Sequence, residues 1–377
     1  MPAVVIVLLL SLLGACQSSS ATPNRRLALV VGNSHYPSAP LSNATNDAFD
    51  MAQTLRDLGF EVIYKQDVTR DEFLTAISTF ANRTNGNGGG LFYYSGHAFQ
   101  LNGVNYLAPI DIGNVASSTV DQTAVRLERV FSALAQSGGA NILLLDSCRN
   151  NPFGDPAAPG LARPQGMPTN TFISFSTAPN RVASDGVGMH SPYTRALLKF
   201  IKDPGTPIEE IFKEVRTIVE TSTENQQTPW EESSLLAPYF FRAPVFMVAQ
   251  FTGADDDAVL IVNGEDMTNW GNDHGNAKRV PLHGGKNPFV VRVFNQRSYT
   301  GGIPGLGGHL PEGWNYAISL HTDDGHTLAS FSDGENQPAD NGPRHGKWFT
   351  VVRGSIDVDA SIDSIRLTEV DARAWTH

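Results

Sequence analysis

The chain has 377 residues, which is long enough for two domains with full hydrophobic cores. Its formal net charge of −11 and its sequence pI ≈ 5.3 disfavour a nucleic-acid partner, because binding to phosphates needs clustered positive charge. The 2 cysteines lie in unlike segments, so stability has to come from hydrophobic cores and not from disulfides.

The N-terminal segment predicts a signal peptide over residues 1–16. The apolar stretch Val4 to Leu13 holds about 10 residues, too few to span a bilayer but typical of a signal-peptide core. It ends in Leu13-Gly14-Ala15-Cys16, which resembles a bacterial lipobox, so Cys16 is the lipidation candidate and 17–24 is a tether. The alternative is an ordinary cleaved signal peptide with an incidental cysteine. The usual basic start is missing from Met1-Pro2-Ala3.

Residues 25–242 alternate between apolar strand patterns and amphipathic helix patterns. We predict strands at Leu27–Val31, Phe60–Tyr64, Gly90–Tyr94, Asn141–Leu145 (leading into Cys148), Phe172–Phe175 and Tyr239–Phe241. Helical spacing predicts helices at Asp47–Leu58, Arg70–Ala81, Ala124–Leu134, Tyr193–Ile201 and Ile208–Glu220. Such alternation is typical of the α/β class, with a mostly parallel sheet covered by helices on both faces.

The pattern changes after residue 242. Residues 243–257 suggest a linker that ends in Asp255-Asp256-Asp257, and the helical period disappears beyond it. Strands are expected at Ala258–Val262, Phe289–Phe294, Tyr316–Leu320, Lys347–Val352 and Ser364–Leu367, with a hairpin turn at Asp323-Asp324-Gly325. Several short strands with such turns predict an all-β sandwich domain over 258–377.

Cys148 and His97 are the candidate catalytic pair. Each stands where an apolar strand ends, and the carboxyl edge of a parallel sheet is where active sites collect. A nucleophilic cysteine needs a base and an oxyanion site, and His97 with backbone N–H groups beside Cys148 and just after His97 could supply them. Taken singly, Cys148 could be a buried small hydrophobe and His97 a structural histidine.

Several blocks of the chain resemble the caspase/metacaspase clan of cysteine peptidases, in the bacterial form often called orthocaspases. They are Tyr93–His97, Val104–Asp111, Asp146–Phe153 and Gln227–Glu231. The resemblance covers roughly 25–242 and implies a caspase-haemoglobinase fold and cysteine endopeptidase activity. On it, His97 and Cys148 match the catalytic dyad, and the backbone of Ala98 and Cys148 matches the oxyanion site.

The same resemblance places Asp47, Ser95 and Asp146 in the primary specificity pocket and implies cleavage after Arg or Lys. Physical chemistry agrees, because a buried guanidinium or ammonium group needs carboxylate partners. As alternatives, Asp47 could cap or charge a helix start, and Ser95 could serve a turn at the strand end.

The sequence departs from the clan at two places. Ala98 stands where a glycine is usual after the catalytic histidine, which keeps the N–H but loses a conformation that glycine favours. Only Asp111 and Asp121 remain as candidates for the acidic cluster that resembles a calcium site in some metacaspases. Calcium activation is therefore not favoured, and we expect no cofactor and no metal. The histidines of the C-terminal part show no tight ligand spacing.

Two functions compete on this evidence. The first is a secreted, lipid-anchored cysteine endopeptidase that cleaves proteins or peptides after Arg or Lys. We expect it in the bacterial cell envelope, either as a periplasmic or outer-membrane lipoprotein held to the membrane by its N-terminal lipid, or secreted. The second is an inactive envelope scaffold whose β-sandwich binds a polymer or a protein. The sequence does not specify an oligomeric state.

Overall fold

The computed structural model describes residues 26–86, 88–113, 118–148, 160–179, 181, 183–254, 257–273, 275–295, 316–333, 347–359 and 364–372. The expected signal peptide 1–16, with Cys16, and the tether 17–24 lie outside these residues. Among the helices of the described ranges, none is long and apolar enough to cross a membrane.

A mainly parallel sheet forms the centre of the N-terminal part, with strand order β2-β1-β3-β6-β7-β8. The first five strands run parallel to their neighbours and β8 is antiparallel to β7. These strands are β1 (Leu27–Gly32), β2 (Glu61–Gln66), β3 (Gly89–Leu101), β6 (Ala140–Cys148), β7 (Thr171–Phe175) and β8 (Trp230–Ser233). The α/β prediction is confirmed.

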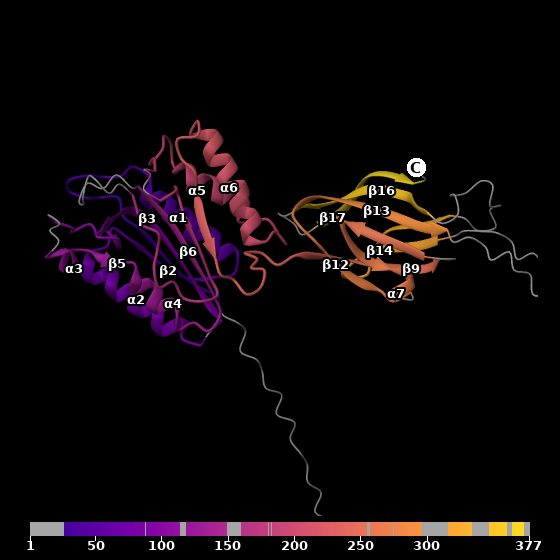
Figure 1. The fold of residues 1–377 in the computed structure, drawn as a ribbon, viewed down its shortest axis with the longest axis horizontal. Helices are drawn as coiled ribbons and strands as arrows, with labels where there is room; N and C mark the ends of the chain where they lie inside the picture. The colour runs from indigo at the N-terminus through magenta and orange to yellow at the C-terminus, as the bar shows by residue number, and fades with distance from the viewer. Residues whose placement is uncertain are drawn as a thin grey trace, which may run out of the picture.

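Helices cover both faces of this sheet, and each face has its own hydrophobic core (Figure 1). On one face lie α2 (Arg70–Thr84) and α4 (Glu128–Leu134), and on the other lie α1 (Ala44–Asp57), α5 (Pro192–Phe200) and α6 (Ile208–Ser222). In α2, Phe73, Ile77 and Phe80 recur at helical spacing and are buried, and Thr69 with Glu72 forms a capping box at its start.

β3 is longer than predicted and leaves the parallel sheet at its end. It continues to Leu101 and pairs antiparallel with β4 (Val104–Leu107), which pairs in turn with β5 (Val125–Arg126). The helix predicted at Ala124–Leu134 is therefore wrong in its first half. That half holds β5, preceded by the short α3 (Val120–Thr123), because Val125 is buried opposite Leu107.

The strand predicted at Tyr239–Phe241 is also wrong, since β8 supplies the last strand of the sheet. Phe241 instead belongs to the hydrophobic core between the sheet and helices α1, α5 and α6, and this burial accounts for the apolar residue at that position. The Arg26 guanidinium donates to the carbonyls of Phe240 and Phe241 and thereby satisfies backbone groups that no strand pairs.

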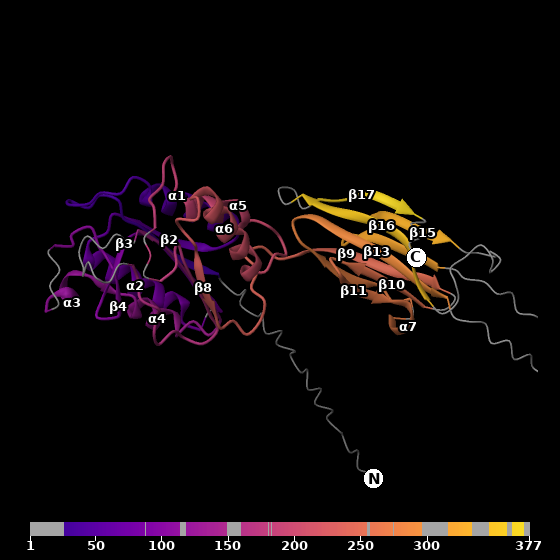
Figure 2. The ribbon, with the colours of Figure 1, turned by 45° about the horizontal axis from the view of Figure 1, so that its top comes forward.

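The C-terminal part consists of antiparallel sheets, as predicted (Figure 2). One has the order β11-β10-β13-β16-β17 and the other β12-β9-β14-β15, and a single core takes side chains from both, so they form a two-sheet sandwich. The elements are β9 (Val245–Ala254), β10 (Asp257–Val262), β11 (Glu265–Asn269), α7 (Trp270–Asp273), β12 (Lys278–Leu282), β13 (Gly285–Asn295), β14 (Tyr316–Thr322), β15 (Thr327–Asp333), β16 (Lys347–Asp359) and β17 (Ser364–Ala372).

Most of the expected linker 243–257 is in fact a strand. β9 occupies Val245–Ala254 and pairs with both β12 and β14. The linker expectation is wrong for these residues because Met247, Ala249 and Phe251 alternate into the sandwich core. The hairpin turn at 323–325 joins β14 to β15 as predicted.

Candidate active site

The register between β3 and β6 brings four of the predicted site residues together. Ser95 is opposite Asp146, and His97 is opposite Cys148, the last residue of β6. Because strand side chains alternate, Ser95, His97 and Asp146 lie on the face of the sheet on which α1 and α5 pack. The side chain of Cys148 and residues 149–159 lie outside the described part of the chain.

His97 is buried and its ring is held in place by the loop before α1. Its Nε2 lies 2.7 Å from the carbonyl oxygen of Ala39, and its ring packs against Tyr36 with centroids 4.6 Å apart. A carbonyl can only accept, so the neutral ring carries its proton on Nε2 and a lone pair on Nδ1. Burial lowers the pKa of His97, while the Ala39 carbonyl and the charge of Asp185 oppose this shift. The imidazole is therefore neutral at neutral pH and can act as a base.

Asp47, in the first turn of α1, is completely buried, with a side-chain exposure of 0%. Ser95 Oγ donates to its Oδ2 at 3.5 Å, and the Ser191 N–H donates to both carboxylate oxygens at 3.3 and 3.4 Å. The Nδ1 atom of His190 lies 2.9 Å from Oδ1. Asp47 thus contacts three residues from two other parts of the chain, β3 and the start of α5, and does more than charge a helix start.

Asp146, on β6, is buried close to Asp47 and shares a partner with it. Its Oδ2 accepts from the hydroxyls of Ser191 and Thr194. Ser191 is the N-cap of α5, where its Oγ also accepts from the Thr194 N–H at 2.9 Å. One serine therefore ties both carboxylates to the start of a helix, and α5 fixes their geometry.

The pKa values of both buried carboxyl groups are raised, so their ionisation is unfavourable in the folded protein. Burial, followed by the charge of Asp146, raises the pKa of Asp47 to about 9. Burial raises the pKa of Asp146 to about 6, against the hydrogen bonds from Ser191 and Thr194. Asp185 adds a third negative charge that acts on both groups. A cation placed among them would remove this penalty, so the cluster is electrostatically suited to a positively charged ligand.

The N–H of Ala98 faces the side of β3 on which β6 lies. The Ala108 N–H donates to the His97 carbonyl at 2.9 Å, so Ala98 and Leu107 form a pair without mutual hydrogen bonds. The N–H of Ala98 consequently points away from β4, toward the strand that ends at Cys148. Ala98 is not among the described non-glycine residues with positive φ, so its conformation does not require glycine.

The candidates for a calcium site already have hydrogen-bond partners in the chain. The Arg126 guanidinium forms an ion pair with the Asp121 carboxylate, and Asp111 accepts from the backbone N–H of Arg70 at 2.9 Å. Within the described residues, no group of three or more His, Cys, Asp or Glu side chains could hold a metal ion. In the described part of the chain, the cation that forms an ion pair with Asp121 is therefore the Arg126 side chain.

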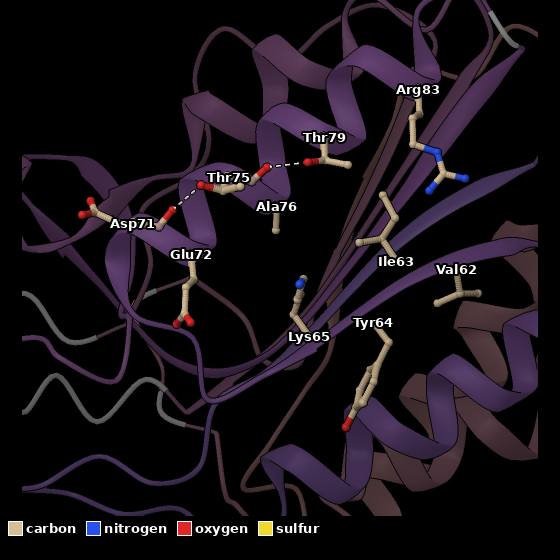
Figure 3. A pocket seen from close by; sticks show the side chains of 10 residues that line it. All are labelled: Val62, Ile63, Tyr64, Lys65, Asp71, Glu72, Thr75, Ala76, Thr79 and Arg83. Atoms are coloured by element: carbon tan, nitrogen blue, oxygen red, sulfur yellow. Dashed lines mark hydrogen bonds between the residues drawn. The ribbon is translucent and has the colours of Figure 1, made fainter.

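A cavity of about 500 Å³ lies between β2 and α2, outside the candidate site (Figure 3). Its lining comes from both elements and includes Tyr64, Lys65, Glu72 and Arg83. None of the predicted site residues contributes to it. The predicted pocket around Asp47 is instead filled by the chain's own side chains.

Sequence reasoning missed His190, Ser191, Thr194 and Asp185, which complete the cluster. Ser191 followed by Pro192 is a helix-start signal that predicts an N-cap, but not its contact with two distant carboxylates. His190 and Asp185 lie in a loop that shows no periodic pattern in the sequence. Only the fold brings this loop to α1 and β6.

A parallel α/β sheet with a histidine and a cysteine at the ends of neighbouring strands defines a class of cysteine peptidases. Residues 25–241, more than half of the chain, match the "Caspase domain" family, and the chain belongs to this family. It is a family of caspase-like cysteine peptidases, which act on proteins.

Two curated relatives are mammalian proteins. Mucosa-associated lymphoid tissue lymphoma translocation protein 1 of Homo sapiens is 27% identical over 181 residues, which cover 47% of this chain and 21% of the relative. Its Mus musculus homolog is 26% identical over 190 residues, covering 50% and 22%. The chain therefore spans about a fifth of the length of these relatives. The crystal structure of caspase-1 from Spodoptera frugiperda aligns with a TM-score of 0.44 at 17% identity, covering 58% of this chain and 90% of that one.

Proposed function

We propose that this protein is a cysteine endopeptidase that cleaves after Arg or Lys. The observation that supports this specificity is the pair of buried carboxylates, Asp47 and Asp146, that Ser191 holds together beside the ends of β3 and β6. A substrate guanidinium or ammonium would offset their mutual repulsion and their burial. A substrate aspartate would add a further negative charge to the same site.

The chemistry follows from the positions of His97 and Cys148. His97 Nδ1 accepts the thiol proton, and the thiolate attacks the carbonyl carbon that follows the basic residue. The N–H groups of Ala98 and Cys148 stabilise the oxyanion of the tetrahedral intermediate. The protonated His97 then gives its proton to the leaving amine. A water molecule, deprotonated by the same ring, hydrolyses the thioester and regenerates the thiol.

Binding of the basic side chain is expected to release a proton. Before a substrate binds, the raised pKa of Asp47 keeps a proton on the carboxyl pair at neutral pH. A guanidinium entering the pocket stabilises the ionised form of both carboxyls, so the proton leaves as the substrate binds. This coupling between proton release and cation binding discriminates against neutral substrate side chains, which do not displace the proton from the carboxyl pair.

The test is a peptide-library cleavage profile of the wild type beside Cys148→Ala and His97→Ala. Cleavage after Arg or Lys that both variants abolish is the expected result. Activity that persists in either variant, or a preference for Asp before the scissile bond, would overturn the proposal. An Arg-directed acyloxymethyl ketone should label Cys148, and prior alkylation should block the labelling.

We also propose that the protein is anchored in a bacterial envelope by a lipid on Cys16. The support is sequence alone, namely the short apolar stretch that ends in Leu13-Gly14-Ala15-Cys16. Palmitate labelling in a bacterial host, lost in Cys16→Ala, is the expected result. Absence of labelling in the wild type would refute the anchor and leave the peptidase proposal untouched.

A further inference from the structure

His190 occupies the position beside Asp47 that a substrate cation would need. Its two ring nitrogens lie against two carboxylates of α1: Nδ1 is 2.9 Å from Asp47 Oδ1 and Nε2 is 3.1 Å from Asp50 Oδ2. The His190 side chain keeps 17% of its surface exposed, whereas Asp47 keeps 0%. The ring therefore stands between solvent and the buried carboxylate.

The other neighbours of Asp47 belong to the fixed frame of the fold. Ser95 is on β3, in the middle of the sheet, and Ser191 is the N-cap of α5. A guanidinium that reaches Asp47 from solvent must replace the contact of His190, because the remaining partners are held by a strand and a helix end. His190 is therefore the partner of Asp47 that a substrate cation could displace.

The segment that carries His190 is an exposed, glycine-containing loop between two anchored ends. Gly186 and Gly188 adopt φ of +80° and +105°, and between and after them Val187 and Met189 are 90% and 68% exposed. At one end the Asp185 carbonyl accepts from Asn43 at 2.6 Å, and at the other Ser191 caps α5. The Nη2 group of Arg195 holds the carbonyls of Val187 and His190 at 2.9 and 3.0 Å.

We propose that His190 is a specificity-determining residue that occupies the basic-residue pocket and competes with the Arg or Lys side chain of the substrate. This inference rests on the proposed function. The ring contacts two carboxyl groups of α1, Asp47 and Asp50, and the negative charges of Asp146 and Asp185 also act on Asp47. A substrate guanidinium or ammonium would compete with the ring for the same Asp47 oxygen.

The competition gives a kinetic signature that a purely structural role would not give. Removing the ring should lower KM for a basic reporter and leave kcat unchanged, because the ring contacts Asp47 and Asp50, which bind the substrate side chain and do not take part in bond cleavage. KM should fall about tenfold, the size expected when one competing hydrogen bond is removed.

The experiment compares wild type, His190→Ala and His190→Gln with a fluorogenic peptidyl-Arg amide, measuring KM and kcat for each. The matched control is His326→Ala, which removes a histidine 3.0 Å from a carboxylate, Asp324, in the C-terminal hairpin. Should His190→Ala fail to fold, the same comparison with His190→Gln decides, since glutamine lacks the imidazole ring that contacts both Asp47 and Asp50.

A binding measurement separates this inference from the proposed function. In a Cys148→Ala background, calorimetry should show that benzamidine binds about tenfold more tightly when His190 is also replaced. Unchanged or weaker benzamidine binding, or an unchanged KM, would overturn the competition. The two proposals can also separate. If no form cleaves after basic residues but the double variant binds benzamidine more tightly, the result would contradict the peptidase proposal and support the competition between His190 and a cation.

Discussion

Asp47→Asn should raise the stability of the protein at neutral pH and lower its activity on basic substrates. The folded carboxyl has its pKa raised from 3.8 to about 9, mainly by burial. A raised pKa in the folded state means that Asp47 contributes its full stability below the unfolded pKa, and that this contribution is lost as pH rises through the folded pKa. Each pH unit between these limits costs about 1.4 kcal/mol at most.

From about pH 5 to about pH 7 the expected loss in the wild type is therefore up to about 3 kcal/mol, and Asp47→Asn should abolish it. Asparagine keeps an oxygen for the Ser191 N–H but does not titrate. Activity changes in the opposite direction. Loss of one partner of a buried ion pair costs about 3 kcal/mol, so kcat/KM for an Arg reporter should fall roughly 10²-fold.

The assay pairs urea denaturation at the two pH values with kcat/KM for peptidyl-Arg and peptidyl-Leu amides. Asp57→Asn is the control, because Asp57 lies on the same helix but is exposed and pairs with Lys202 at 3.0 Å. A variant that loses stability at both pH values, with equal losses on both reporters, would show that Asp47 only supports the fold and would refute the reasoning.

The remaining predictions concern residues near Asp47 and the candidate calcium ligands. Ser191→Ala should destabilise the protein by about 2–4 kcal/mol in denaturant titrations, because it removes an N-cap and a donor to buried Asp146; a loss within about 0.5 kcal/mol would contradict the bridging role. The acid limb of the kcat/KM profile should lie below pH 6.5, because burial lowers the pKa of His97 and only the neutral ring is a base. Asp185→Asn should move this limb further toward acid, since it removes a charge that raises the pKa of His97; an alkaline shift would be inconsistent with it. Chelation by EGTA should leave activity unchanged, because Arg126 already pairs with Asp121, and a loss restored by added calcium would contradict this.

The sequence predicted the parallel sheet because its central strands are buried on both faces and are therefore continuously apolar. Leu143, Leu144 and Leu145 show this best, since adjacent residues face the cores on opposite sides. From the same pattern the sequence placed His97 and Cys148 at one edge. It could not give their register, because the offset between β3 and β6 depends on how the whole sheet assembles.

The errors have one physical cause, which is that apolar spacing reports burial and not the element that is buried. Phe241 is buried without belonging to a strand, and Val125 is buried in a short strand where a helix was expected. β9 was missed for a related reason: its half-buried positions alternate around polar Gln250 and Thr252, which resembles a linker in composition. The sequence could not predict site residues such as His190, because a loop has no hydrophobic periodicity that would indicate its position in the fold.

The register between β3 and β6 places the proposed specificity residues and the proposed catalytic pair on the same two strands. Ser95 is opposite Asp146, and His97 is opposite Cys148. A shift of β6 against β3 by one residue would turn the Asp146 side chain to the opposite face of the sheet and separate it from Ser191 and Thr194. The hydrogen bonds from these two hydroxyls therefore oppose such a shift and help to hold the register on which the proposed site depends.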